Sequence, residues 1–519
     1  MMQRRRFLKT TGAAVSIPLL LNGIRLSAMP RTSIFNAVDD ANDRVLVLIQ
    51  LSGGNDGLNM VLPTDQYDGL AAVRSNILIP QNAILPLTDA TGINPSMTSV
   101  KNMYDNGRLA VIQAVGYPDQ NRSHFRSTDI WTSGSPANQV WRTGWMGRYF
   151  DSQYPDYPEG YPNTEHPHPF AITMGNLVSE TCQGIATNFS LTLEDPFALG
   201  QLPEGQIGPV PNTPYGRELD FLRTAIAQTN QYATAITEVA TAGNTLANYP
   251  VNRLAEQLQH VARLISGGLQ TKIYVVNLGG FDTHANQVNP DNPTQGTHVE
   301  LLRTLSDAMA AFQEDLRLLG IEQRVISITF SEFGRRIRSN AAVGTDHGTA
   351  APLLMFGSCV QPQVLGDNPE ISANVSVDEG VPMQHDFRDV YGSVLMDWFD
   401  VPEEDVRTFL YDGFTRLPIV APCAVNAVED TLDVPEPDMS VFPNPMGQST
   451  TIAFKSLSTG RVRLSVFDAM GNELKVLLDQ RLSSGEHTLN WDASGLPAGV
   501  YFCRLVLDGR QQVRRVVKG

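Results

Sequence analysis

Five short segments rich in apolar residues, the first of them unbroken, are the clearest pattern in the first four fifths of the chain. They lie at residues 45–49, 109–115, 272–278, 324–330 and 352–356. A run of this kind predicts a strand buried on both faces, as in a parallel sheet covered by helices. Segments with apolar residues at helical spacing separate the runs. They lie at residues 125–131, 215–269, 296–319 and 389–399, with a break at Pro250 in the second. This alternation predicts an α/β fold with a doubly wound, mostly parallel sheet over residues 40–420.

The pattern changes after a segment rich in proline and acidic residues at 421–437, which we interpret as a linker. Beyond it, apolar and polar residues alternate in short stretches separated by turn residues such as those at 469–472. The predicted strands are 451–454, 461–467, 487–491, 500–507 and 512–517. We expect residues 438–519 to form a small β-sandwich.

Composition narrows the possible classes of function. A chain of 519 residues is too long for one ordinary core, so more than one domain is expected. The formal net charge of −16 argues against a nucleic-acid partner, which needs clustered Lys and Arg, and is compatible with bound divalent cations. The four cysteines show no CxxC spacing, which argues against a zinc-thiolate site. One disulfide is possible in an exported protein, but the sequence does not pair the cysteines.

Residues 1–28 have the order of an export signal, with basic, apolar and small-residue zones in turn. The apolar zone, 12–21, is too short to span a bilayer, so we expect no transmembrane segment in the mature protein. An amphipathic N-terminal helix is the alternative. The run RRRFLK at residues 4–9 resembles the twin-arginine consensus. That resemblance implies export in the folded state through the twin-arginine translocase.

Acidic and imidazole side chains follow the predicted strands at their ends or in adjoining loops. These residues are Asp56, Asp282, His284, Glu332, Asp346 and His347. In an open α/β sheet, ligands bind beyond the carboxyl ends of the strands, so we expect these side chains to converge there. Carboxylate and imidazole groups together suit a divalent metal such as zinc, calcium or manganese. The alternative is that they cap strand ends and satisfy buried hydrogen bonds.

Five further residues are candidates for catalysis and substrate binding. Ser123 precedes a predicted helix, where a serine is either a nucleophile favoured by the helix dipole or a plain N-cap. His124 either protonates a leaving group or fills the core. Arg126 and Arg335 either bind the free oxygens of an anion or form surface ion pairs. We assign Asn55, in the glycine-rich turn after the first strand, to substrate binding as well.

The body of the chain resembles the family called domain of unknown function 1501. The matching pieces are LSGGNDGLN at 51–59, SHF at 123–125, GFDTHxxQ at 280–287, SEFGR at 331–335 and GTDHG at 344–348. That family is similar in fold to alkaline phosphatases and sulfatases, which hold one or two metals beside a Ser, Thr or formylglycine nucleophile. The resemblance implies metal-side roles for the six residues above and a nucleophile role for Ser123. Two departures stand out: Glu332 lies where those phosphatases have Asp-His-Gly, and the sulfatase signature Cys/Ser-x-Pro-x-Arg is absent.

The tail closely resembles the type A C-terminal sorting domain of the type IX secretion system. The matching pieces are FPNP at 442–445, VFDxxG at 466–471 and LPAGVY at 496–501, with the basic residues Arg514, Arg515 and Lys518 at the end. The resemblance implies transit through the periplasm, passage across an outer membrane by the type IX machinery, and a final place at the cell surface or outside the cell.

Together these features predict an exported, metal-dependent hydrolase of phosphate or sulfate esters, with an anionic ester or glycan as substrate. One alternative is a non-catalytic surface protein that binds a glycan or a partner. A second is a serine esterase with a GxND block, because residues 53–56 fit that block. The esterase class also needs an earlier Gly-Asp-Ser and a late Asp-x-x-His, and neither is found here.

Overall fold

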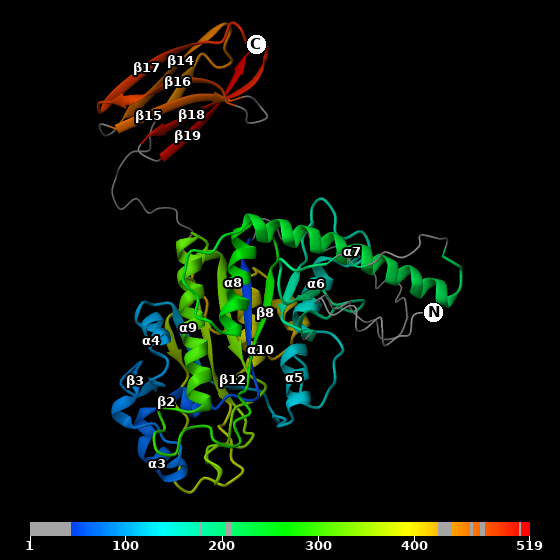
Figure 1. Ribbon diagram of the computed structural model, residues 1–519, viewed down its shortest axis with the longest axis vertical. Coiled ribbons are helices and arrows are strands. Elements are labelled where there is room, and N and C mark those ends of the chain that lie inside the picture. Colours follow the sequence, from blue (N-terminus) through cyan, green and yellow to red (C-terminus); the bar gives the residue numbers. More distant parts are fainter. Residues whose placement is uncertain are drawn as a thin grey trace. The chain divides into compact units, whose positions relative to one another are not determined.

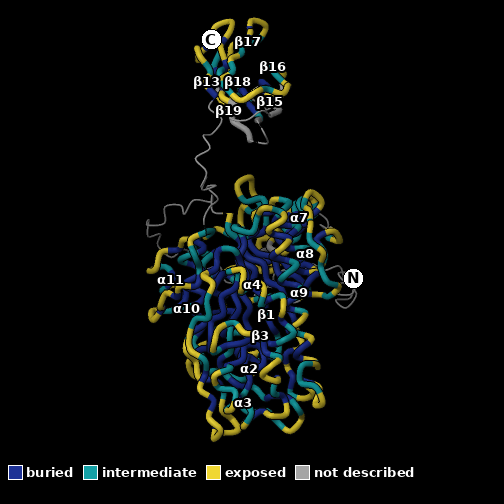
Figure 2. The backbone as a smooth tube through the Cα atoms, turned by 90° about the vertical axis from the view of Figure 1, so that its left-hand side faces the viewer, coloured by how far each residue is buried: buried dark blue, intermediate teal, exposed yellow. Residues whose placement is uncertain are grey.

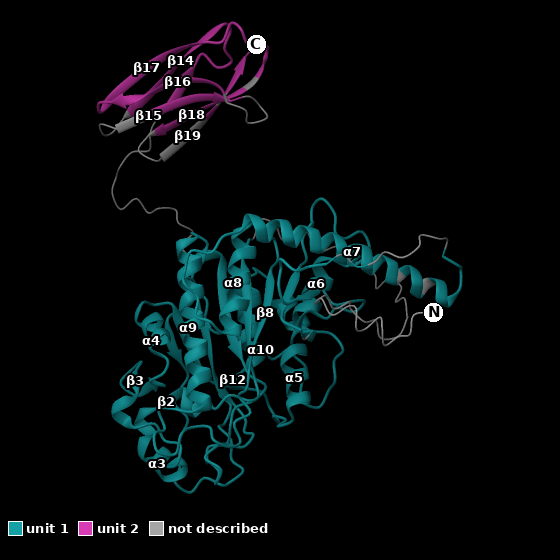
Figure 3. Cartoon of the chain, in the orientation of Figure 1, with its two compact units in different colours: residues 1–424 teal, residues 425–519 magenta. Residues whose placement is uncertain are grey.

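The computed structural model describes residues 43–176, 178–200, 202, 210–423, 439–456, 460–467, 473–507 and 510–518. The predicted signal at 1–28, residues 424–437 of the predicted linker and the turn at 469–472 lie outside the described residues. The chain divides into two compact units, residues 1–424 and 425–519 (Figure 3).

Unit 1 is built on a nine-stranded sheet with the order β11-β5-β10-β9-β1-β8-β6-β7, in which β12 also pairs with β5. The strands are β1 (Val45–Ser52), β5 (Leu109–Gly116), β6 (Ala171–Met174), β7 (Ser190–Leu193), β8 (Ile273–Gly279), β9 (Val325–Phe330), β10 (Ala351–Phe356), β11 (Gln363–Leu365) and β12 (His385–Asp386). All pairs are parallel except those of β10 with β5 and β9. The predicted α/β class with a mostly parallel sheet is confirmed. The sequence pattern missed β6, β7, β11 and β12 because two to four residues give no periodic signal.

Helices cover both faces of the sheet (Figure 1). One face carries α4 (Thr98–Asp105), α7 (Pro214–Ala242), α8 (Arg253–Ser266) and α9 (Thr297–Leu318), and the other carries α5 (His124–Ser133), α6 (Trp145–Gln153), α10 (Phe387–Asp397) and α11 (Glu403–Phe409). Side chains of β1 alternate between the two cores, with Val47 and Ile49 in one and Leu46 and Leu48 in the other. The central strands are buried as a result, as Figure 2 shows. An apolar run buried on both faces is therefore what this architecture requires.

Smaller elements complete unit 1. They are α2 (Gly57–Met60), α3 (Tyr67–Arg74), the antiparallel strands β2 (Val61–Pro63), β3 (Leu85–Pro86) and β4 (Thr91–Ile93), and 3₁₀ turns at Thr64–Gln66, Gln81–Ala83, Glu180–Cys182 and Glu322–Arg324. No helix in the described ranges has both the length and the apolar character needed to cross a bilayer.

Three loops start at the same edge of the sheet because the strands before them end in register. Ser52 pairs with Gly279, and Gln50 pairs with Phe330. The antiparallel strand β10 starts at this edge, since Ala351 pairs with Val115 near the end of β5. The loop before β10 therefore joins the loops that follow β1, β8 and β9. Gly53 allows the loop after β1 to lie close against the loop after β8. Its φ is +122°, and a Cβ there would collide with the backbone of that second loop.

Unit 2 contains two antiparallel sheets, as predicted for a β-sandwich. One has the order β13-β14-β17 and the other β16-β15-β18-β19. The strands are β13 (Met439–Phe442), β14 (Ser449–Ser456), β15 (Gly460–Phe467), β16 (Glu473–Leu482), β17 (Gly485–Asp492), β18 (Gly499–Leu507) and β19 (Arg510–Lys518). Ile452, Val466, Trp491 and Cys503 lie in its core. The sequence pattern missed β16 because its three consecutive apolar residues, 476–478, break the alternation.

The structure also pairs two of the four cysteines. Cys359, just after β10, forms a disulfide with Cys423, and their Cα atoms are 4.8 Å apart. Backbone hydrogen bonds from Gln361 to Ile419 and from Ala421 to Cys359 support the same contact. Cys182 and Cys503 are buried and free. The disulfide therefore attaches the last described residues of unit 1 to its sheet.

Candidate metal centre

Three histidines turn their Nε2 atoms toward one carboxylate at the edge of the sheet. Asp282 and His284 lie in the loop after β8, His347 in the loop before β10, and His124 on the first turn of α5. Asp282 Oδ1 is 3.0 Å from His284 Nε2 and 3.2 Å from His347 Nε2, and these two nitrogens are 2.9 Å apart. Asp282 Oδ2 is 3.5 Å from His124 Nε2. The ligand atoms of His124, Asp282 and His347 all lie within 4.8 Å of one another, so this group could hold a metal ion.

The opposite nitrogen of each imidazole is held by an acceptor. His284 Nδ1 is 2.9 Å from Asp346 Oδ1, and His124 Nδ1 is 2.8 Å from Glu332 Oε1. His347 Nδ1 donates to the backbone carbonyl of Arg122 at 2.8 Å. Since carboxylate and carbonyl oxygens only accept, these contacts place a proton on each Nδ1, and a neutral ring then directs its Nε2 lone pair toward Asp282. Metal-binding histidines are commonly oriented in this way.

The charges of the group also suit a cation. Partial burial alone would raise the pKa of Asp282, but the hydrogen bond from Arg335, the contact with the His347 imidazole and the charge of Arg335 lower it to about 2. A hydrogen bond with His284 lowers the pKa of Asp346. Burial lowers the pKa of His347, which favours its neutral, metal-binding form. At neutral pH the group therefore presents ionised carboxylates beside an imidazole nitrogen with a free lone pair.

Arg335 holds the loops of this edge together. Its guanidinium is fully buried, and it donates to the carbonyls of Gly53 and Gly54, to that of Thr345 at 2.9 Å, and to that of Phe281 at 2.9 Å. It also donates to Asp282 Oδ1 at 2.8 Å. The sequence suggested that Arg335 binds a substrate anion. In the structure its donors are directed to protein oxygens, so it positions Asp282.

Glu332 follows β9 and is buried, with 3% of its surface exposed. Its Oε1 accepts hydrogen bonds from the backbone N–H of Gly53 at 2.8 Å and from His124. The backbone carbonyl of Glu332 accepts from Trp131 Nε1 at 2.9 Å. Glu332 thus connects the loop after β1 to α5 and orients His124.

Asp56 lies apart from these residues. It is fully buried, its Oδ2 is 3.0 Å from Arg74 Nη1, and it accepts from Gln287 Nε2 at 2.6 Å. Burial would raise its pKa, but the positive charge of Arg74, the neighbouring His298 and the hydrogen bonds from Gln287 and Arg74 lower it. In the described chain Asp56 makes no hydrogen bond or ion pair with the three clustered imidazoles. Its charge is neutralised by Arg74.

Asn55 and His298 form a separate contact in which both side chains are buried. His298 Nε2 is 2.9 Å from Asn55 Oδ1, and His298 Nδ1 is buried without a hydrogen-bond partner among the described residues. Burial lowers the pKa of His298 to about 4, so the ring is neutral at pH 7. Asn55, which we assigned to substrate binding, is 1% exposed and held by the protein.

Ser123 is the N-cap residue of α5, but its side chain makes no capping hydrogen bond. Its backbone N–H instead donates to Asn121 Oδ1 at 2.8 Å. Arg126, on the same helix, donates to backbone carbonyls of a loop, including those of Pro136 at 3.2 Å and Ala137 at 3.3 Å. Ser123 is therefore exposed, and its hydroxyl makes no hydrogen bond within the described part of the chain, whereas Arg126 is engaged by the protein.

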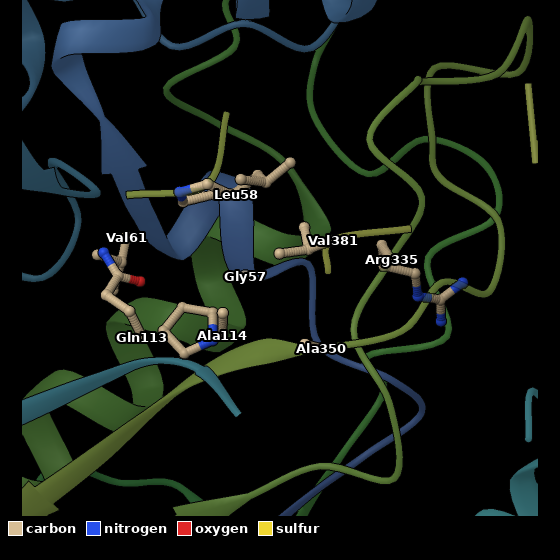
Figure 4. Close-up of a pocket in the computed structure, with 10 residues that line it drawn as sticks. Gly57, Leu58, Val61, Gln113, Ala114, Arg335, Ala350 and Val381 are labelled. Carbon is tan, nitrogen blue, oxygen red and sulfur yellow. The ribbon is translucent and has the colours of Figure 1, made fainter. Parts of the chain in front are cut away.

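The group lies on open loops. The side chains of Asp282 and His284 are 48% and 44% exposed. A cavity that Arg335 lines together with Gly57, Leu58, Gln113 and Ala350 has a volume of about 10 Å³ (Figure 4). One water molecule needs about 10–15 Å³, so that cavity does not admit an ester. The imidazoles are therefore accessible from their exposed side and not through that cavity.

The structure thus brings together six of the predicted site residues. They are His124, Asp282, His284, Glu332, Asp346 and His347. The sequence did not identify four residues that hold the predicted ones in place. Arg74 and Gln287 bind Asp56, His298 binds Asn55, and Arg336 lies 3.5 Å from Asp346. Gln287 lies within the GFDTHxxQ stretch, which could have drawn attention to it. Nothing in the local sequence links Arg74 to Asp56, because their pairing depends on the placement of α3.

Two family models match the chain. One, described as a protein of unknown function (DUF1501), matches residues 225–397, and the other, a secretion system C-terminal sorting domain, matches residues 440–519. The sorting domain implies export to the cell surface or beyond. A comparison with curated proteins gave no match.

Several solved structures resemble parts of the chain. A protein in the alkaline phosphatase superfamily from Vibrio parahaemolyticus is 10% identical, with 86% of this chain and 79% of that chain covered and a TM-score of 0.31. The PsFucS1 sulfatase from Pseudoalteromonas sp. is 9% identical, with 86% and 83% covered and a TM-score of 0.29. Latent PorU from Porphyromonas gingivalis is 19% identical over 16% of this chain, with a TM-score of 0.13. The matched region spans only 9% of the length of PorU.

Proposed function

We propose that this protein is an exported, metal-dependent hydrolase of phosphate or sulfate esters. The observation that supports it most is the convergence of three Nε2 atoms on the carboxylate of Asp282, with each Nδ1 held by an acceptor. A purely structural cluster of histidines would not need every ring to be oriented in the same sense. The proposal further includes a twin-arginine signal at residues 1–28 and type IX export through residues 438–519, which would place the hydrolase at the cell surface or outside the cell.

The donor set suits the proposed cation. Asp282 Oδ1, His284 Nε2 and His347 Nε2 are separated by 2.9–3.2 Å. Ligands of one tetrahedral zinc ion, at about 2.0–2.2 Å each, lie about 3.3 Å from one another. These three residues would hold the ion, and manganese is also compatible with the donors. When bound, such a cation polarises an ester oxygen and lowers the pKa of a nucleophile.

Ser123 and His124 would carry the reaction on the protein side. The Ser123 hydroxyl is the proposed nucleophile because it is exposed, uncapped and adjacent to His124 in the chain. The first-turn N–H groups of α5 would stabilise negative charge that develops nearby. His124 Nε2 is farther from Asp282 than the other two Nε2 atoms are, at 3.5 Å. We assign it to accept the proton of the Ser123 hydroxyl and to pass that proton to the leaving oxygen. Glu332 would keep His124 in the required tautomer.

The proposal is tested by measuring metal content and ester hydrolysis on the purified chain. We expect stoichiometric zinc or manganese in the parent protein and in Ser123→Ala, and loss of the metal in Asp282→Asn. Hydrolysis across a panel of aryl and alkyl phosphates and sulfates should fail in both variants. Asp220→Asn, on the exposed side of α7, is the control and should behave like the parent. A parent protein with neither metal nor hydrolysis would refute the proposal.

One observation favours the alternative of a non-catalytic surface protein. Asp56, at the end of β1, is fully paired with Arg74 and Gln287, so one carboxylate of the predicted metal set is already neutralised. If the same measurements give no metal and no hydrolysis, a binding protein on this fold becomes the better description.

A further inference from the structure

Two arginines at the rim of the metal centre contact the same exposed residue, Asp378: one binds its carboxylate and the other its backbone carbonyl. Arg336 Nη2 is 2.9 Å from Asp378 Oδ1, and Arg122 Nη1 donates to the backbone carbonyl of Asp378 at 2.8 Å. Arg122 contacts one imidazole directly through its backbone, and Arg336 is connected to another through one carboxylate. The carbonyl of Arg122 holds His347, and Arg336 Nη1 is 3.5 Å from Asp346, which holds His284.

The contact with Asp378 leaves much of their hydrogen-bonding capacity unused. The Asp378 side chain is 79% exposed. A surface ion pair of this kind contributes little to stability, so another anion can replace it. Arg336 Nε is buried without a partner among the described residues. Arg122 uses Nη1 for the bond to Asp378, and its remaining N–H groups have no partner in the part of the chain that the structure describes.

We infer that Arg122 and Arg336 form a subsite for a second anionic group of the substrate. The substrate is then a multiply sulfated or phosphorylated molecule, with one ester at the imidazoles and a neighbouring anionic group on the two guanidiniums. Guanidinium groups bind sulfate and phosphate oxygens through paired, charge-assisted hydrogen bonds. Asp378 acts as an internal counter-ion that the incoming anion displaces. The inference rests on the proposed hydrolase function, which it extends to a substrate class.

The open position of the centre agrees with this substrate class. A small ester bound at the imidazoles alone would have few enclosing contacts, because the side chains of Asp282 and His284 are nearly half exposed. A second anchoring point a short distance away would supply the missing affinity. The net charge of −16 disfavours non-specific attraction of polyanions, so a local pair of arginines is needed to bind one.

The experiment measures binding rather than turnover. Sucrose octasulfate is titrated calorimetrically into the full chain, with inorganic sulfate as the probe that carries a single anion. We expect one sucrose octasulfate per chain, weakened roughly tenfold or more in Arg122→Gln and in Arg336→Gln, because each change removes charge-assisted hydrogen bonds. Asp378→Asn should bind more tightly than the parent, since the competing carboxylate is gone. Arg303→Gln, in an exposed pair with Glu300 on α9, is the matched control and should bind like the parent.

Parent-like binding by both arginine variants would overturn the inference, as would a failure of Asp378→Asn to bind more tightly. The gain in Asp378→Asn cannot result from misfolding, so a poorly folded arginine variant does not leave the question open. Failure of the subsite is distinct from failure of the hydrolase. Hydrolysis of single esters without arginine-dependent binding of sucrose octasulfate removes the subsite alone. Arginine-dependent binding without any hydrolysis supports the subsite and counts against the proposed reaction.

Discussion

Glu332 Oε1 lies 2.8 Å from His124 Nδ1 and fixes the direction in which that imidazole faces. Because the same oxygen accepts the N–H of Gly53, the glutamate is itself held in place. The orientation of His124 therefore depends on two loops that are far apart in the sequence. This relationship gives the first prediction.

Glu332→Gln should slow the hydrolysis of alkyl esters by about 100-fold or more, because the neutral amide no longer favours the tautomer that His124 needs for proton transfer. Aryl esters with a good leaving group should be much less affected, since they need little proton donation. The check is a comparison of kcat for the two ester classes, with metal content measured alongside. An equal loss for both classes would contradict the assigned role. Glu300→Gln, on the exposed surface of α9, is the control.

Asp346→Asn should lower metal affinity by about 10–100-fold while leaving the fold intact. Asp346 orients His284 through Nδ1, and outer carboxylates of this kind raise the basicity of the ligating nitrogen. Competition with a chelator of known affinity measures the effect. Affinity equal to that of the parent would show that His284 does not bind the metal or needs no orientation.

Ser123→Ala should change the free energy of unfolding by less than about 0.5 kcal/mol, because the serine side chain makes no capping bond. Thr213 is the matched comparison, since its side chain accepts from the N–H of Gly216 at the start of α7. Thr213→Ala should cost about 1 kcal/mol. Urea unfolding of both variants provides the measurement. A cost for Ser123→Ala as large as that for Thr213→Ala would favour the plain N-cap role.

His298 should make the fold less stable in mild acid. Burial lowers its pKa to about 4, whereas an unfolded histidine titrates near 6.5. Between these values the unfolded chain binds the extra proton, so stability is full above pH 6.5 and falls as the pH drops toward 4. The loss should reach about 3 kcal/mol. His298→Gln should remove this part of the pH dependence in denaturant unfolding from pH 7 to pH 4. An identical pH profile of stability in parent and variant would rule out this contribution of His298.

The disulfide between Cys359 and Cys423 should stabilise unit 1 by about 4 kcal/mol, because it closes a loop with a sequence separation of 64 residues. Unfolding of the double variant Cys359→Ala/Cys423→Ala should match that of the parent under reducing conditions. If the oxidised and reduced parent are equally stable, this expectation is wrong.

The sequence by itself determined the building blocks of this protein. The apolar run at 45–49 and the apolar-rich segment at 324–330 indicate strands buried on both faces. Alternation in the tail indicates an antiparallel sandwich. Both can be recognised because the pattern of buried positions is local to each element. The glycine-rich turn and the Asp-x-His after β8 also marked two of the loops that form the centre. These features need only neighbouring residues to be recognised.

Only the tertiary structure decided which side chains meet. Asp346 and His347 reach the other loops because β10 runs antiparallel and starts at the edge where β1 and β8 end. Asp56 follows a strand as Asp282 does, yet α3 delivers Arg74 to it and removes it from the imidazole group. The pairing of Cys359 with Cys423 was equally invisible in the sequence. Strand order, strand direction and helix placement fix such contacts, and they depend on packing between segments that are distant in the chain.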